Sequence, residues 1–253
     1  MKKYIIKFAK IFKPFVKELI FKPFNRLTRH SSKTLVLQNL KKCRIPVSQI
    51  VDVGVSTSTD ELINCFSKLE HLLFEPVKKY HTVIKKNYRR INYQLFKVAL
   101  SDSKGSAYLI ESSSWGNGIS THSSISANPK KIDGKKIIKS DQINIEFLDS
   151  YNELILHNCL LKIDVDGFDL EVLKGSKEVL KKASIVIVEA TWSTLAERAA
   201  FIEKNGFVLY DMADKCLYGN ALWQCDLVYV RKDFKNLLRQ NINDFNYFLW
   251  HEL

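Results

Sequence analysis

Short apolar runs alternate with helical patterns from Gln49 onward, and this alternation constrains the fold more than any other feature of the chain. It predicts βα units and a mostly parallel sheet. The predicted strands are Gln49–Val53, His71–Glu75, Tyr93–Leu100, Leu160–Val165 and Ser184–Ala190, then Phe207–Asp211 and Gln224–Arg231. The predicted helices cover about residues 59–68, 77–88, 146–156, 168–182 and 194–205.

The last two predicted strands have no helix between them. A connection of that length is too short for a parallel crossover, so the pair is predicted to be an antiparallel hairpin. Five parallel strands followed by a terminal hairpin are typical of class I methyltransferases. The predicted fold class is therefore α/β, with a Rossmann-like, mostly parallel seven-stranded sheet and a C-terminal antiparallel hairpin.

Residues 103–140 interrupt the alternation with a stretch that is rich in serine and glycine. This insertion follows the third strand, at the edge where an open α/β sheet binds its ligands. We therefore interpret it as a lid or acceptor-binding loop rather than as a linker. His122, within it, is either a base near neutral pH or, as we prefer, a solvent-exposed side chain.

The positive charge of the chain is confined to its beginning. Residues 1–44 hold 13 Lys and Arg against one acid, Glu18, while the remainder is neutral. Apolar residues in the first 30 positions recur at steps of three and four, which predicts a basic amphipathic helix. Such a helix either lies on an anionic membrane surface or docks on the domain. The predicted divisions are a basic arm at 1–44, a catalytic domain at 45–232 and a helical tail at 233–253.

The cysteine pattern bears on where the protein works. Its five cysteines are scattered and include no C-x-x-C pair, so neither a disulfide framework nor a zinc site is expected. Reduced thiols predict a cytoplasmic protein, peripheral on the inner face of the membrane if the arm binds lipid. We expect no secretory signal and no membrane span, because lysines interrupt the only candidate apolar stretch.

The first motif that carries chemistry is Asp52-x-Gly54 at the end of the first strand. Glycine permits a sharp turn and close backbone approach, and the following amides can bind a carboxylate or phosphate. Ser56 and Thr57 continue this loop with hydroxyl groups that can cap the next helix. By itself the motif is also compatible with an ordinary βα turn.

The second motif is Glu75-Pro76, at the end of the second strand. A carboxylate about 20 residues beyond the glycine turn is placed to bind the two hydroxyls of a ribose. Pro76 is suited to the first turn of the helix that follows. Together with Asp52, Glu75 favours a nucleoside ligand.

The third motif places acids around the end of the central fourth strand, in the sequence Leu161-Lys-Ile-Asp164-Val-Asp166-Gly-Phe-Asp169-Leu-Glu171. Asp164 can orient the cofactor or the acceptor, and Asp166 and Asp169 can bind acceptor hydroxyls or serve as general base. Alternatively, Asp169 and Glu171 are surface positions of the next helix. Glu189, at the end of the fifth strand, either faces the acceptor or only ends the strand. No histidine stands at ligand spacing, so no metal is predicted.

These segments, in this order, resemble the FkbM family of methyltransferases over about residues 48–232. The matching segments are Asp52-Val-Gly54, Leu73-Phe-Glu75-Pro76, Ala99-Leu-Ser101-Asp102, Gly116-Asn117-Gly118, Leu161-Lys-Ile-Asp164-Val-Asp166-Gly167 and Val172-Leu-Lys-Gly175. The resemblance implies S-adenosylmethionine as cofactor and methylation of a hydroxyl oxygen, commonly on a sugar of a glycan, glycolipid or glycosylated natural product. It also places Ala99, Ser101 and Asp102 near the adenine, and Ser56 and Ser58 in a loop where relatives usually carry more glycine.

Other functional classes fit the sequence less well. A nicotinamide oxidoreductase needs G-x-G-x-x-G, and this loop offers only Gly54. A nucleic-acid methyltransferase is disfavoured by the neutral body of the chain. A non-catalytic, membrane-associated scaffold remains the alternative to the enzyme. Trp192 and Trp223 are suited to stacking on a sugar ring, but we expect core packing for each.

Overall fold

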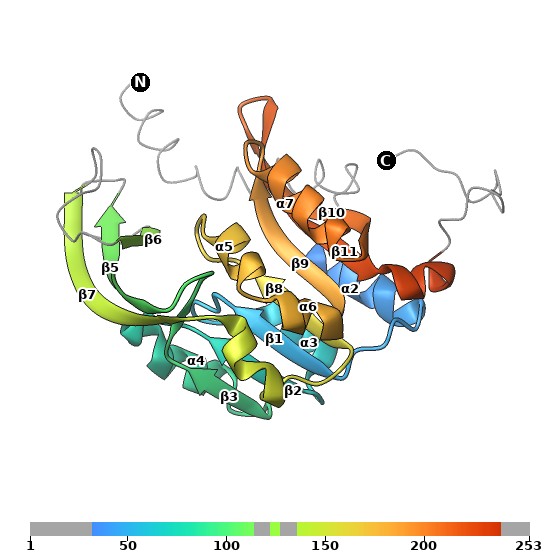
Figure 1. Ribbon diagram of the computed structural model, residues 1–253, viewed down its shortest axis with the longest axis horizontal. Helices are drawn as coiled ribbons and strands as arrows, with labels where there is room; N and C mark the ends of the chain where they lie inside the picture. Colours follow the sequence, from blue (N-terminus) through green and yellow to red (C-terminus); the bar gives the residue numbers. More distant parts are fainter. Residues whose placement is uncertain (1–31, 114–121, 127–135, 239–253) are drawn as a thin grey trace, which may run out of the picture.

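The structure is a computed structural model that describes residues 32–113, 122–126 and 136–238, with backbone alone for residues 109–141 within these ranges. Its main sheet has seven strands in the order β10-β11-β9-β8-β1-β2-β3 (Figure 1). They are β1 (Gln49–Val53), β2 (Glu70–Phe74), β3 (Tyr93–Phe96), β8 (Cys159–Ile163), β9 (Ala183–Thr191), β10 (Phe207–Tyr218) and β11 (Ala221–Arg231).

The strand directions agree with the sequence analysis. β1 pairs in parallel with β2 and β8, β2 with β3, and β8 with β9. β11 is antiparallel to both β9 and β10. The predicted mostly parallel seven-stranded sheet with an antiparallel terminal hairpin is therefore confirmed. All five residues of β1 are buried, as expected for a central parallel strand that is covered on both faces.

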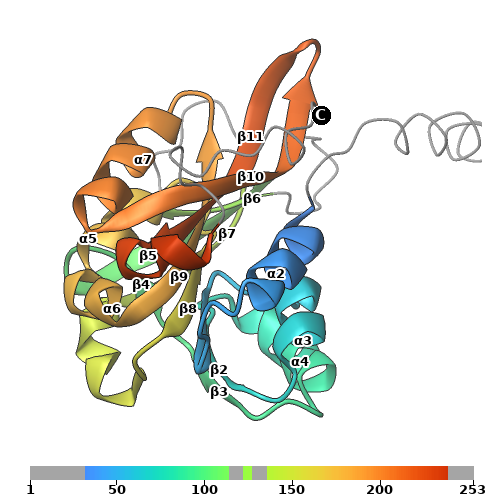
Figure 2. The same ribbon diagram turned by 90° about the vertical axis from the view of Figure 1, so that its right-hand side faces the viewer.

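Helices cover both faces of this sheet (Figure 2). One face packs α2 (Lys33–Lys42), α3 (Asp60–Phe66) and α4 (His81–Asn87), and the other packs α5 (Asp169–Lys174), α6 (Lys177–Lys182) and α7 (Leu195–Lys204). Short 3₁₀ helices are η1 (Lys78–Tyr80), η2 (Leu148–Leu154) and η3 (Lys232–Leu237). The result is a three-layer α/β/α sandwich whose core lies on both sides of the sheet.

Two predicted helices differ from the observed ones. The helix predicted over residues 168–182 is interrupted at Gly175, which separates α5 from α6. A Cβ at Gly175 would lie 2.1 Å from the Ser101 carbonyl oxygen, so close backbone packing fixes the interruption. The region predicted as helical over residues 146–156 forms η2, a 3₁₀ helix.

Helix α2 belongs to the body of the protein, although the sequence analysis assigned residues 33–44 to the arm. Val36, Leu37 and Leu40 on its apolar face are buried in the cluster that also contains Ile50 and Leu62. Its N-terminus is capped by Ser32, whose hydroxyl accepts a hydrogen bond from the Leu35 amide. Residues 1–31, and with them the predicted amphipathic helix, lie outside the described residues.

The predicted third strand, Tyr93–Leu100, is two strands in two sheets. Its second part, β4 (Ala99–Leu100), joins a four-stranded sheet of order β4-β7-β5-β6. The other strands there are β5 (Gly105–Ser113), β6 (His122–Ser126) and β7 (Lys136–Glu146). Much of the insertion predicted as a polar loop is thus paired strand, because distant segments supply hydrogen-bond partners that local composition does not reveal. Residues 114–121, which include Gly116-Asn117-Gly118, and 127–135 lie outside the described residues.

Within the described residues, no helix is long and apolar enough to cross a bilayer. The same residues contain no group of three or more His, Cys, Asp or Glu arranged to hold a metal ion.

Candidate active site

Gly54 ends β1 in a conformation that only glycine adopts readily. Its φ is +83°, and a Cβ there would lie 1.8 Å from the backbone oxygen of Asp164. Its amide donates to the Phe74 carbonyl, and the Asp164 amide donates to Val53, each at 3.0 Å. The turn therefore joins the carboxyl ends of β1, β2 and β8 at one point, as the predicted motifs require.

Glu75 lies beside this turn and is held by the backbone. Its Oε2 accepts from the Ser56 amide at 2.7 Å and its Oε1 from the Val77 amide at 2.8 Å. Burial raises the pKa of Glu75 to about 7, and the two amide hydrogen bonds oppose that rise. Each oxygen keeps a second lone pair, so the carboxylate can still accept hydrogen bonds from two ligand hydroxyls.

Ser56 takes a left-handed conformation, with φ +54°, in the loop where the resemblance expects more glycine. This conformation directs its amide to Glu75. The serine therefore meets the geometric requirement of the loop at some cost in backbone strain. Thr57 lies next to it, and its carbonyl accepts from the Asn87 side-chain amide at 3.0 Å.

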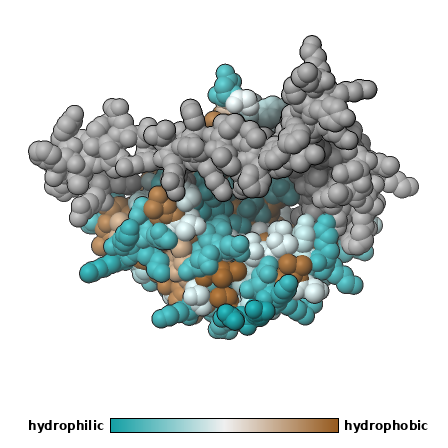
Figure 3. Space-filling view, turned by 180° about the vertical axis from the view of Figure 1, so that it is seen from behind, coloured by the Kyte–Doolittle hydropathy of each residue, from teal (hydrophilic) through white to brown (hydrophobic). Residues whose placement is uncertain are grey.

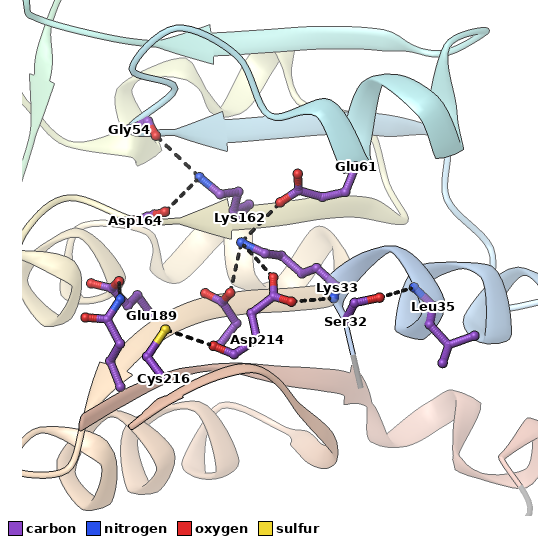
Figure 4. Close-up of polar contacts among 12 residues, drawn as sticks. Ser32, Lys33, Leu35, Gly54, Glu61, Lys162, Asp164, Glu189, Asp214 and Cys216 are labelled. Atoms are coloured by element: carbon purple, nitrogen blue, oxygen red, sulfur yellow. Dashed lines mark hydrogen bonds and ion pairs between the residues drawn. The ribbon is translucent and has the colours of Figure 1, made fainter. Parts of the chain in front are cut away.

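Asp52 lies beneath the turn, fully buried. Lys162, opposite it in the register of β1 and β8, places its ammonium 3.3 Å from Asp52 Oδ1 and 3.4 Å from Asp164 Oδ2. The same ammonium donates to the Gly54 carbonyl at 3.3 Å (Figure 4). Burial alone would lower the pKa of Lys162, but Asp52 and Asp164 outweigh it and raise that pKa. One buried cation thus holds the two acids and the glycine turn together.

Glu189 stands on the neighbouring strand β9. Its Oε1 accepts from the Gln224 side-chain amide at 2.7 Å, and Asp226 lies directly opposite on β11. Burial raises the pKa of Glu189 to about 7, and the negative charges of Asp164, Asp169, Asp226 and Asp166 add to the rise. Glu189 is thus half-buried among acids, so its position is not only that of a strand end.

Lys33 brings α2 to the same region. Its ammonium lies 3.1 Å from Glu61 Oε1 of helix α3 (Figure 4). It also lies 2.9 Å from Asp226 Oδ2, so it links α3 to strand β11. Burial raises the pKa of Asp226, and Lys33 opposes that rise. Lys33 therefore compensates part of the acidic charge around Glu189.

Asp169 is neither a ligand at the edge nor a surface residue. It is buried at the beginning of α5, accepts from the Val165 amide at 3.2 Å, and pairs with Arg198 of α7 at 2.8 Å. Burial raises the pKa of Asp169 to about 6, and Arg198 opposes the rise. Arg198 also donates to the Glu189 carbonyl, so this pair fixes the ends of β8 and β9 relative to each other.

The remaining predicted residues surround this region. Asp166 lies on the exposed turn after β8, with φ +49°. Ala99 and Ser101 are buried at the end of β4, and Ser101 donates to Asp102 at 3.4 Å. Pro76 follows Glu75, but η1 begins two residues later, so its predicted place in a first helical turn is wrong.

Comparison with known protein families shows which family the chain belongs to. Residues 52–209 match the model of the methyltransferase FkbM domain, and this range contains every predicted site residue. The chain belongs to the FkbM methyltransferase family. Its cofactor is S-adenosylmethionine, as predicted. A comparison with curated proteins gives no match.

Solved methyltransferase structures resemble the chain only remotely. A precorrin-6y C5,15-methyltransferase from Geobacter metallireducens is 13% identical, covers 79% of this chain and 88% of its own, and has a TM-score of 0.43. The magnesium protoporphyrin IX methyltransferase from Synechocystis, with bound cofactor, is 9% identical. The match covers 78% of this chain and 76% of that protein, with a TM-score of 0.45. An rRNA methylase from Streptococcus thermophilus is 7% identical. The match covers 78% of this chain and 93% of that protein, also with a TM-score of 0.45. These values are too low to support inferences about substrate.

Several residues at or near this site were missed or misjudged from sequence. Lys162, Arg198 and Lys33 were not singled out, although Arg198 interrupts the buried face of α7 next to Ile202. Trp192 and Trp223 were expected in the core and are 65% and 47% exposed. That expectation is wrong because Trp192 follows the last residue of β9, and Trp223 lies on the part of β11 that continues past its pairing with β9. The side chain of His122 lies outside the described residues.

Proposed function

We propose that this FkbM protein is an O-methyltransferase that acts on a sugar hydroxyl in a glycan, a glycolipid or a glycosylated natural product. We assign Glu189 the role of general base. The observation that carries the assignment is its position: a half-buried carboxyl on β9, opposite Asp226 of β11 and close enough to Asp164 for that charge to help raise its pKa to about 7. A base is most effective when its pKa lies near the working pH.

The cofactor side of the site is assigned to the ends of β1, β2 and β4. The close approach of Gly54 and the amides after it suit the amino-acid part of the cofactor, with Ser56 and Thr57 in the same loop. Asp52 supports that loop from below through Lys162. The two Glu75 oxygens suit the ribose hydroxyls. Ala99, Ser101 and Asp102 would flank the adenine.

Catalysis then depends on alignment and on one proton transfer. S-adenosylmethionine supplies the electrophilic methyl group. Glu189 accepts the hydroxyl proton as the acceptor oxygen takes the methyl group, whose bond to the sulfonium sulfur would break with its electron pair left on sulfur. Asp164 and Asp166 hold neighbouring acceptor hydroxyls. Asp164 is the weaker candidate for the base, because the Lys162 ammonium already lies 3.4 Å from its carboxylate.

A sugar acceptor is supported by Trp192. This exposed indole follows β9 directly, three positions after Glu189. Its amide donates to the Trp223 carbonyl at 3.0 Å, so the hairpin fixes its backbone beside the site. An exposed aromatic ring directly after the strand that carries the proposed base is suited to the apolar face of a sugar.

The test is transfer of labelled methyl groups to a panel of oligosaccharide and glycolipid acceptors. Glu189→Gln is expected to lower turnover about 10²–10⁴-fold, with unchanged affinity for S-adenosylhomocysteine. With saturating cofactor, which removes the effect of Glu75 on cofactor binding, wild-type turnover should rise with pH through about 7, where Glu189 loses its proton, and this dependence should disappear in the variant. Glu178→Gln, an exposed acid on α6, is the matched control and should change neither quantity.

Two other variants can overturn the assignment. If Asp166→Asn or Asp164→Asn abolishes turnover while Glu189→Gln retains it, the general base is the aspartate whose substitution abolished turnover, and not Glu189. If wild-type protein gains no thermal stability from S-adenosylmethionine or S-adenosylhomocysteine, the non-catalytic scaffold is the better description.

We also propose a cytoplasmic location, with residues 1–30 on the anionic inner face of the membrane. The support is the charge of the arm, because each base near such a surface contributes about 1 kcal/mol to binding. Binding to anionic vesicles should weaken with salt. Unchanged binding after deletion of residues 1–30 would contradict this role of the arm.

A further inference from the structure

The β10–β11 hairpin extends past the end of its neighbour in the sheet. The pairing of β11 with β9 ends at Gln224 and Thr191, whereas β10 and β11 continue to pair as far as Tyr218 and Ala221 (Figure 1). From behind, its tip stands above the rest of the described surface as a small cap of mixed hydropathy (Figure 3). The tip projects at the carboxyl edge of the parallel strands, the edge that carries Gly54, Asp164 and Glu189.

Large apolar side chains on this tip face solvent. Leu217 is 62% exposed and Tyr218 is 79% exposed. Trp223, also exposed, places its ring 5.8 Å from the Tyr218 ring. A leucine with tyrosine and tryptophan on a projecting turn is the combination that partitions into the interface of a bilayer, where the ring bodies are buried and their polar atoms stay hydrated.

The basic beginning of the chain enters the domain beside this hairpin. The backbone amide of Lys33 donates to Asp214 Oδ1 at 3.1 Å, and its ammonium lies 3.8 Å from Asp214 Oδ2. The described chain therefore begins next to β10, and the residues that precede it in the sequence, 1–31, carry nine Lys and Arg against one acid. An anionic surface that attracts those charges would be held close to the aromatic tip.

We propose that the tip formed by Leu217, Tyr218 and Trp223 is a second membrane contact, which inserts into an anionic phospholipid surface. Stable peripheral binding needs two signals, such as an apolar insertion together with a basic segment. Two contacts at one edge also reinforce each other, because binding of one raises the local concentration of the other. Insertion of the tip would turn the catalytic edge toward the bilayer. Together with the proposed methyl transfer, on which this step rests, that orientation makes a lipid-linked sugar the acceptor class.

The test is sedimentation of the full-length protein with vesicles of phosphatidylcholine, with and without phosphatidylserine. Tyr218→Ser/Trp223→Ser is expected to lower the partition coefficient about tenfold or more on both kinds of vesicle. The matched control is Leu154→Ser/Leu156→Ser, two exposed leucines near the amino end of β8, and it should leave partitioning unchanged. Salt should weaken the charge-dependent part of binding in all variants equally.

Equal vesicle binding by wild type and the tip variant would overturn the proposal. So would a tip variant that binds vesicles normally but loses methyl transfer to a soluble oligosaccharide, because the tip would then be a sugar platform. Unchanged S-adenosylhomocysteine affinity in the tip variant shows that it is folded. The proposed methyl transfer fails on different evidence, namely no transfer to any acceptor by a protein that still binds vesicles through its tip.

Discussion

The two halves of the catalytic edge are built by different means. At the ends of β1 and β2, the position of the Glu75 carboxylate is set by backbone amides and by a glycine turn. At the ends of β8 and β9, Asp164 and Glu189 are placed by side chains, chiefly Lys162 and Gln224. Backbone groups thus position the carboxylate in the half assigned to the cofactor, at the ends of β1 and β2. Side chains position the carboxylates in the half assigned to the acceptor, at the ends of β8 and β9. A family that keeps one cofactor can therefore change acceptors by substitution on the second half alone.

The largest expected effect comes from the turn that both halves share. Gly54→Ala should lower the free energy of unfolding by about 5 kcal/mol, because its Cβ meets the Asp164 carbonyl and its φ is positive. Gly206→Ala is the control: its φ is +92°, but nothing lies within 4 Å of the added Cβ, so about 1–2 kcal/mol is expected. Equal losses in urea unfolding would mean that the contact with Asp164 is unimportant.

Removal of the cation between the halves ranks next. Lys162→Met should cost about 3–4 kcal/mol in urea unfolding, because it leaves Asp52 buried without a countercharge. Adding Asp52→Asn should restore part of that loss. If the double variant is no more stable than Lys162→Met, the pairing with Asp52 is not what Lys162 contributes.

Glu75→Gln tests most directly whether the ends of β1 and β2 bind the cofactor and the ends of β8 and β9 do not. It should weaken S-adenosylhomocysteine binding by about 1.5–3 kcal/mol in calorimetric titration, the range for hydrogen bonds to a charged acceptor. Glu189→Gln should leave that affinity unchanged. An equal effect of both substitutions would show that the two halves do not divide cofactor from acceptor.

Titration of Glu75 should appear in cofactor binding. The pKa of Glu75 in the free protein is raised to about 7, so affinity for S-adenosylhomocysteine should rise between pH 6 and 8 as the carboxylate forms. The rise should be at most about tenfold per pH unit and absent in Glu75→Gln. For stability the sign is opposite. The folded state binds the proton more tightly than the unfolded state, so the contribution of Glu75 falls as pH rises from about 4.5 to 7.

The smallest effect concerns the serine in the glycine turn. Ser56→Gly should change the free energy of unfolding by less than about 1 kcal/mol, because relief of the left-handed strain is offset by the greater flexibility of the unfolded chain. Arg44→Gly, also left-handed and outside the site, is the control. A marked gain in cofactor affinity for Ser56→Gly alone would show that the serine narrows the loop.

Sequence periodicity was sufficient for the order along the chain and the direction of the strands in the main sheet, but not for the hairpin tip: β10 was predicted to end at Asp211 and continues to Tyr218. The burial patterns of β1 and β8 follow from runs of apolar residues, and the short connection before β11 required an antiparallel hairpin. The second sheet was missed because β5 and β7 lie about 30 residues apart and pair across a polar stretch. Local composition contains no information on such partners.

The sequence by itself determined where Gly54, Glu75, Asp164 and Glu189 stand, because strand ends at a parallel edge converge whatever fills the rest of the chain. Only the tertiary structure decided what each of them contacts. Glu75 is held by amides, Asp164 by Lys162, and Asp169 is withdrawn to Arg198. The physical reason is that a carboxylate's partner depends on which side chains neighbouring strands and helices bring within about 4 Å, and on how much water remains between them.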